Sequence, residues 1–175
     1  MIPEAYKFLN DISDLPRIVK AGLSQLGTKE ITGTGNNATI LSWAKELNIS
    51  NTYNADSIPW CGLFVALCVQ RSGRKPVDSP LWARSWAKWG KAVQTAMLGD
   101  ILVFAREGGG HVGICIAEDK DCYHVLGGNQ SDAVIITRIK KIRCVSINRP
   151  VYENQPASVK QYFVSASGEI SANEA

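Results

Sequence analysis

Hydrophobic residues in the first ninety positions recur every three or four residues, which is the spacing of an amphipathic helix. This spacing predicts helices over residues 15–26, 40–47, 60–73 and 79–90. A glycine ends three of these runs, as is common at helix C-termini. Polar loops such as TGTGNN and NISNTYNADS separate them. The first half of the chain is therefore predicted to be helical.

After Gly99 the pattern changes to short runs that are rich in β-branched residues and separated by turn-like sequences. These runs are DILVF, HVGICIAE, CYHVLGG, AVIITRI and CVSINRP. Helices followed by strands favour an α+β fold, in which N-terminal helices pack on a C-terminal antiparallel sheet of five to six strands or a partial barrel. We expect residues 1–150 to form a single domain. Residues 151–175 are small and polar, which predicts a partly ordered tail with one candidate strand at QYFVS.

The predicted helix over residues 60–73 places a cysteine in its first turn. Pro59 suits that turn, and Ser57 or Asp56 could cap it. Apolar side chains cover nearly every face of this helix, which predicts a buried position. A helix N-terminus can lower a thiol pKa from about 8.5 to the range of about 3.5–7.5. Cys61 is therefore a candidate nucleophile, with a packing role as the alternative, whereas Cys68 lacks this advantage.

The bulk composition excludes several classes of protein. The 175 residues are 45% hydrophobic and 20% charged, with a net charge of +3. This charge is too small to indicate a nucleic-acid partner. Five cysteines without a C-x-x-C pair and only two histidines predict neither a disulfide framework nor a metal site, and we expect no cofactor. Cys68, Cys115, Cys122 and Cys144 lie in apolar segments and are expected to be reduced packing residues.

A second candidate for chemistry is His111, which follows three glycines and opens a predicted strand. Glycines at such a position favour close approach of a substrate backbone. A neighbouring strand should supply a group that orients the imidazole, and Asn129, Gln130 and His124 are the candidates. The trio of Cys61, His111 and Asn129 would supply a thiolate nucleophile, a general acid–base and an orienting amide. Such a trio performs acyl transfer on amides.

Other prominent residues leave two interpretations open. Trp82, Trp86 and Trp89 share one face of a predicted helix, where they either pack in the core or line a substrate groove. His124 is expected to face solvent or to seal the sheet rather than to act in catalysis. The basic run over residues 138–143 is expected to be the solvent-exposed face of a strand pair, with binding of an anionic polymer or membrane surface as the alternative.

Four motifs, in this order, resemble a known family. PWCGLFV, GDILVF, GHVGICIAE and LGGNQSDAV are similar to motifs of the CHAP and NlpC-type cysteine peptidase superfamily. More narrowly, they resemble a phage and bacterial subgroup with Pro-Trp-Cys, Gly-His-Val-Gly and Gly-Gly-Asn-Gln motifs. The resemblance covers roughly residues 23–150. The subgroup leads one to expect an acidic pair just before Pro59, where this chain has only Asp56.

The resemblance implies a papain-like fold and the hydrolysis of amide bonds in peptidoglycan peptides. Carried over by position, Cys61 is the nucleophile and His111 the base. Asn129 is the first choice for the third residue, with Gln130 the alternative, and Asp100 holds a turn. The implied oxyanion donors are the Cys61 backbone N–H and a group from Tyr53 or Asp56. The implied substrate groove contains Trp60, Gly110 and Trp82.

The N-terminal sequence carries acidic residues and no long apolar core, so we expect no signal peptide and no membrane anchor. A protein made in the cytoplasm would then reach the periplasm or cell wall through a holin-type lesion or a secretion system. We expect a monomeric phage endolysin first. The alternatives are an injected amidase toxin, which would have an immunity protein as partner, a non-catalytic wall-binding or assembly module, and an intracellular thiol protease.

Overall fold

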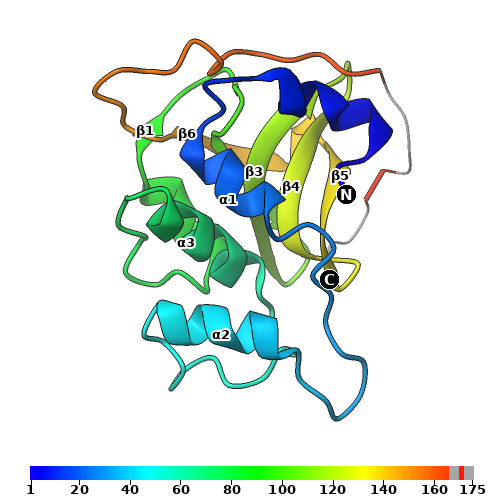
Figure 1. Ribbon diagram of the computed structural model, residues 1–175, viewed down its shortest axis with the longest axis vertical. Helices are drawn as coiled ribbons and strands as arrows, with labels where there is room; N and C mark the ends of the chain where they lie inside the picture. The colour runs from blue at the N-terminus through cyan, green and yellow to red at the C-terminus, as the bar shows by residue number, and fades with distance from the viewer. Residues whose placement is uncertain (166–169, 172–175) are drawn as a thin grey trace.

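The computed structural model describes residues 1–165 and 170–171 and has the α+β architecture that the sequence predicts (Figure 1). All helical elements except η3 precede the strands. The helices are η1 (Glu4–Asp11), α1 (Arg17–Leu23), α2 (Ala38–Glu46), α3 (Cys61–Arg71), η2 (Ala83–Lys88) and η3 (Lys141–Arg143). The strands are β1 (Lys91–Ala92), β2 (Ile101–Arg106), β3 (Gly109–Glu118), β4 (Cys122–Gln130), β5 (Ala133–Lys140) and β6 (Cys144–Arg149).

The strands form one antiparallel sheet, six-stranded within the described residues, in the order β1-β6-β2-β3-β4-β5. Strands β2 to β5 form a meander, and β6 returns to pair with β2 on its other edge. The register shifts between Gly127 and Gln130, where β4 pairs with β5. An irregularity of this kind breaks the simple alternation of side chains between the two faces.

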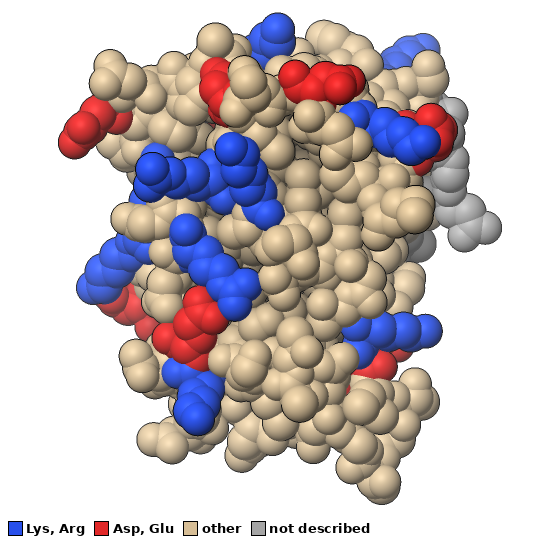
Figure 2. All heavy atoms as spheres, in the orientation of Figure 1, with Lys and Arg blue, Asp and Glu red and all other residues tan. Residues whose placement is uncertain are grey.

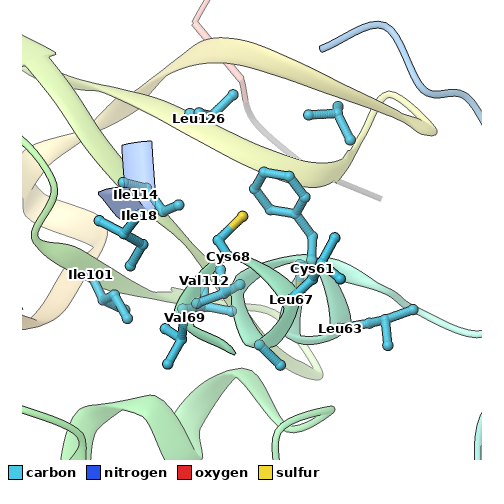
Figure 3. Packing of buried hydrophobic residues seen from close by; sticks show 14 of the residues in the cluster. Ile18, Cys61, Leu63, Leu67, Cys68, Val69, Ile101, Val112, Ile114 and Leu126 are labelled. Atoms are coloured by element: carbon cyan, nitrogen blue, oxygen red, sulfur yellow. The ribbon is translucent and has the colours of Figure 1, made fainter. Parts of the chain in front are cut away.

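Helix α3 is the buried centre of the fold, as its all-round apolar sequence predicts. Its residues from Cys61 to Val69 are all buried. It packs on β3 and β4 and contacts α1 and α2. Figure 3 shows side chains of α3 packed with Ile18 of α1, Val112 and Ile114 of β3 and Leu126 of β4. Burial on every side fixes both the axis and the rotation of this helix.

The opposite face of the sheet carries a smaller apolar cluster. Along β2, Ile101 and Val103 join the large cluster around α3, whereas Leu102 and Phe104 join the smaller one. Burial of both faces explains why β2 reads as a continuous apolar run rather than as an alternating one.

His124 lies in a buried polar network, which rules out the solvent-facing position that was one of the two expected for it. Its Nε2 lies 2.9 Å from Asp119 Oδ2, and its Nδ1 lies 2.9 Å from the Tyr6 hydroxyl. Arg138, expected on the solvent-exposed face, donates to the same carboxylate at 2.8 Å and is only 9% exposed. The N-terminal η1 brings Tyr6 onto this end of the sheet, which explains the burial. A carboxylate only accepts hydrogen bonds, so the Nε2 of His124 carries the proton.

The segment after β6 runs back across the domain (Figure 1). Ser158 is buried and bonds to Asp14 through its backbone N–H and its hydroxyl. Within the described part of residues 151–175, the predicted QYFVS strand is replaced by an isolated parallel bridge between Phe163 and Glu118. The remainder of the predicted tail, residues 166–169 and 172–175, lies outside the described residues.

Asp100 holds a turn, as expected from the sequence. Its side chain accepts a hydrogen bond from the Met97 backbone N–H and forms a two-pronged pair with Arg149 of β6. The carboxylate is fully buried, so this pair ties β6 to the start of β2. In residues 1–165 and 170–171, no helix combines the length and apolar character that crossing a membrane requires.

His124 makes stability depend on pH. Burial lowers its pKa below the ordinary 6.5, so the unfolded chain takes up a proton first as the pH falls. Stability present above about pH 6.5 is then lost at lower pH, by up to about 1.4 kcal/mol per pH unit. Urea denaturation at about pH 7.5 and 5.5 should show a smaller difference for His124→Gln than for the wild type. An unchanged difference would contradict a buried neutral imidazole.

Candidate active site

The first residue of α3 is Cys61, preceded by Trp60 in the N-cap position. Among the described residues, no side chain caps this helix, so the predicted roles of Ser57 and Asp56 as caps are wrong. The helix start is instead held by packing. A Cβ added to Gly62 would lie 2.1 Å from the Pro80 carbonyl oxygen and 2.9 Å from that of Leu81. Only glycine allows the chain at residues 80–81 to lie this close to α3.

A pocket of about 610 Å³ opens at this helix start. It brings Cys61 of α3 together with His111 of β3, two residues that the sequence patterns assigned to chemistry. Gly110 and Trp82, predicted for the groove, also line it, and 75% of Trp82 is exposed. The remaining lining residues are Ile58, Pro59, Leu81, Ala83, Arg84, Arg106, Gly108, Gly109 and Asn129.

The side chain that orients His111 is Gln130. The Oε1 atom of Gln130 lies 3.0 Å from Nε2 of His111. The Gln130 amide nitrogen donates to the carbonyl oxygens of Val125 and Ile135 at 3.2 and 2.7 Å. These two bonds fix the amide so that its oxygen faces His111 and accepts the Nε2 proton. The lone pair of the neutral imidazole is therefore on Nδ1.

Asn129, the first choice for this orienting role, lines the pocket instead. Its φ of 56° places it in the left-handed region, inside the irregular end of β4 between Gly127 and Gln130. The two neighbouring amides consequently have different roles in the structure: Gln130 contacts His111, and Asn129 forms part of the pocket wall.

The glycines of the LGGN sequence allow this arrangement. A Cβ at Gly127 would lie 2.6 Å from Gln130 Oε1 and 3.2 Å from His111 Nε2. At Gly128 it would lie 2.7 Å from the Trp60 ring. The first glycine leaves room for the His–Gln pair, and the second allows β4 to pack against the residue that precedes Cys61.

The thiol pKa of Cys61 is shifted in the direction opposite to the one predicted from the helix N-terminus. Burial raises it above the usual value. Hydrogen bonding from the backbone N–H groups of Val112 and Gly62 and the charge of Arg106 lower it, but by less. Burial also raises the pKa of Cys68. The Cys61 thiol therefore needs a base to become a nucleophile, and His111 in the same pocket is the candidate.

Tyr53 and Asp56, predicted as oxyanion donors, have a structural role instead. Both are 1% exposed. The Asp56 carboxylate accepts hydrogen bonds from the backbone N–H groups of Ile31 and Asn37, and the Tyr53 hydroxyl donates to the Asp56 carbonyl oxygen. They fix the loop before α2 rather than the pocket. The backbone N–H of Cys61 remains the candidate oxyanion donor, because the first N–H groups of a helix have no partner within it.

Trp60 lies outside its predicted groove, whereas Trp82 and Trp86 divide between the groove and the core, the two positions left open for them. Trp60, predicted for the groove, is fully buried and donates from Nε1 to Glu30 Oε2 at 3.1 Å. Trp86 is buried and bonds to the Pro80 carbonyl, while Trp82 is exposed, so the residues do not share one environment. The reason is that only Trp86 lies within the 3₁₀ helix η2, whereas Trp82 and Trp89 flank it with extended backbone, so the expected α-helical spacing does not hold.

Arg84 and Arg106 are pocket residues that the sequence patterns did not predict. Arg84 lies two positions after the exposed Trp82, and Arg106 opens the REGGG turn before His111. The one sequence feature that could have indicated these arginines was their closeness along the chain to Trp82 and His111. In the described part of the chain, no group of three or more metal-ligating side chains that could hold a metal ion is found.

Reactivity of the thiols tests this geometry. Burial raises the pKa of both Cys61 and half-buried Cys144. Iodoacetamide should nevertheless modify Cys61 about tenfold faster near neutral pH, because His111 lies in the same pocket and can act as its base. His111→Ala should remove this advantage without altering the rate at Cys144. Peptide mapping of the alkylated protein measures both rates. Equal rates at the two thiols in the wild type would contradict a paired Cys61.

No family model and no curated protein sequence matches the chain. The pocket geometry and the motif resemblance are therefore the observations that bear on the function.

Proposed function

We propose that this chain is a cysteine hydrolase that cleaves amide bonds in peptidoglycan peptides. One observation carries the proposal: Cys61 at a helix start and His111 on the adjoining strand line the same pocket, with Gln130 Oε1 lying 3.0 Å from Nε2 of the imidazole. A thiol, a base of defined tautomer and a third group that orients the base are the parts that thiol acyl transfer requires.

In the proposed mechanism, His111 Nδ1 takes the proton of the Cys61 thiol as the sulfur attacks the substrate carbonyl carbon. The oxyanion that forms accepts a hydrogen bond from the Cys61 backbone N–H. The imidazolium then gives its proton to the leaving amine, and a thioester remains on the sulfur. Water, deprotonated by the same imidazole, hydrolyses the thioester and restores the thiol. Gln130 keeps the imidazole in one orientation and accepts its Nε2–H throughout.

Two features support a cell-wall peptide over other amides. The first is the ordered resemblance of four motifs to peptidoglycan hydrolases of the CHAP and NlpC type. The second is the open pocket, flanked by the exposed indole of Trp82, which suits a substrate that is part of a large polymer. Among such hydrolases we propose a phage endolysin that acts on the wall after release through a holin-type lesion.

A digest of Gram-negative-type peptidoglycan tests the proposal. The wild-type protein should release fragments with new amino and carboxyl ends, whose masses identify the bond. Cys61→Ala should reduce this release by at least about 10³-fold, because no other group in the pocket can form the thioester. Cys144→Ser should retain activity and serves as the matched thiol control. The absence of release by the wild type on several wall types would favour the non-catalytic alternative.

A pair of variants separates the roles of the two neighbouring amides. Gln130→Ala should lower kcat by about 10²-fold, since the imidazole loses its orienting acceptor. Asn129→Gly removes the other amide at a position whose φ of 56° glycine tolerates, and should lower kcat much less. Thermal denaturation of both variants checks that the fold persists. A larger loss of kcat for Asn129→Gly would return the orienting role to Asn129.

A further inference from the structure

Among the described residues, the charged side chains that line the pocket are all basic. Arg84 and Arg106 both line it, and none of its described lining residues is acidic. The chain as a whole has 19 basic and 16 acidic residues. By contrast, the hollow beside α1 that contains Arg17, Lys20 and Arg74 also contains Asp14 and Glu153. Figure 2 shows this mixture of basic and acidic side chains over the face that carries α1 and α3.

The guanidinium of Arg84 is held in place at the pocket wall. Arg84 belongs to η2, and its Nε and Nη2 atoms donate to the Gly109 carbonyl oxygen at 3.3 and 3.0 Å. Its Cγ lies 3.3 Å from the Cβ that would be added at Gly110, so the stem rests on the glycine turn beside His111. A guanidinium has five N–H donors, and only some of them are used in this contact. A fixed cation loses little side-chain entropy when it binds an anion.

Arg106 places a second positive charge close to the reacting sulfur. It is the last residue of β2, immediately before the turn that leads to the glycines and His111. It lines the same pocket as Cys61, and its charge is one of the influences that lower the thiol pKa of Cys61. A ligand group near Arg106 would therefore also be near the bond under attack.

We propose that Arg84 and Arg106 form a carboxylate-recognition subsite, so that the enzyme prefers amide bonds flanked by a free carboxylate and discriminates against the same peptide in amidated form. This inference rests on the proposed cysteine hydrolase. Arginine matches a carboxylate with two parallel hydrogen bonds, whereas a neutral carboxamide presents only one acceptor oxygen and carries no charge. Charge-assisted hydrogen bonds in a partly enclosed pocket correspond to discrimination of about 10- to 100-fold.

The test uses two synthetic stem peptides that differ only in whether the carboxyl groups flanking the cleaved amide are free or converted to carboxamides. The wild type should cleave the free form with at least a roughly tenfold higher kcat/KM. Arg84→Gln and Arg106→Gln should each lower kcat/KM for the free form by about 10-fold or more, mainly through KM, and change that of the amidated form by less than about threefold. Lys88→Gln removes one charge from η2 outside the pocket and should leave both values unchanged.

Binding of the same peptides to Cys61→Ala, measured by calorimetry, separates the subsite from the chemistry. Preferential binding of the free form that the arginine variants abolish supports the subsite even if the wild type cleaves neither peptide, a result that would overturn only the hydrolase. Cleavage of both forms at equal rates would overturn the subsite and leave the hydrolase intact. Equal losses for the two peptides in Arg84→Gln and Arg106→Gln would also overturn it, since they would indicate a structural role.

Discussion

The close packing of the α3 start against strand β4 and the chain at residues 80–81 is the constraint on which the site depends. Added Cβ atoms at Gly62 and Gly128 would lie 2.1 Å from Pro80 O and 2.7 Å from the Trp60 ring, so these surfaces meet without room for a side chain. This contact places Cys61 beside β3 although, among the described residues, no side chain caps the helix. Close packing therefore fixes the position of Cys61, together with the hydrogen bonds that Trp60 donates to Glu30 and Trp86 donates to the Pro80 carbonyl.

The same burial determines the resting state of the nucleophile. A helix N-terminus favours a thiolate, but removing the sulfur from water disfavours it more, and the balance leaves the pKa of Cys61 raised. In the proposed mechanism the thiol therefore depends on His111 for its deprotonation. An isolated helix start would give a more acidic thiol but no defined direction of attack.

The α+β fold and two members of the site could be predicted from the sequence because their signals are local. Helical spacing marks α3, and the glycines before His111 mark a place of close approach. Gln130 could not be separated from Asn129, because side chains alternate regularly only in a regular strand and the register shifts between Gly127 and Gln130. Trp60 is buried and bonds to Glu30 rather than lining the groove, and His124 is buried beside Tyr6. Both contacts join residues far apart in sequence, so no local pattern indicates them.

Gly127 carries a consequence for how this sequence can change. A Cβ added there would lie 2.6 Å from Gln130 Oε1 and 3.2 Å from His111 Nε2, so any larger residue would displace the pair. A shorter residue at position 130 would create the space but would lose the acceptor for the imidazole. Neither position can therefore drift independently, and the effects of substitutions at the two are not additive. In a mutational landscape the two positions form an epistatic unit, in which the effect of a replacement at one depends on the residue at the other.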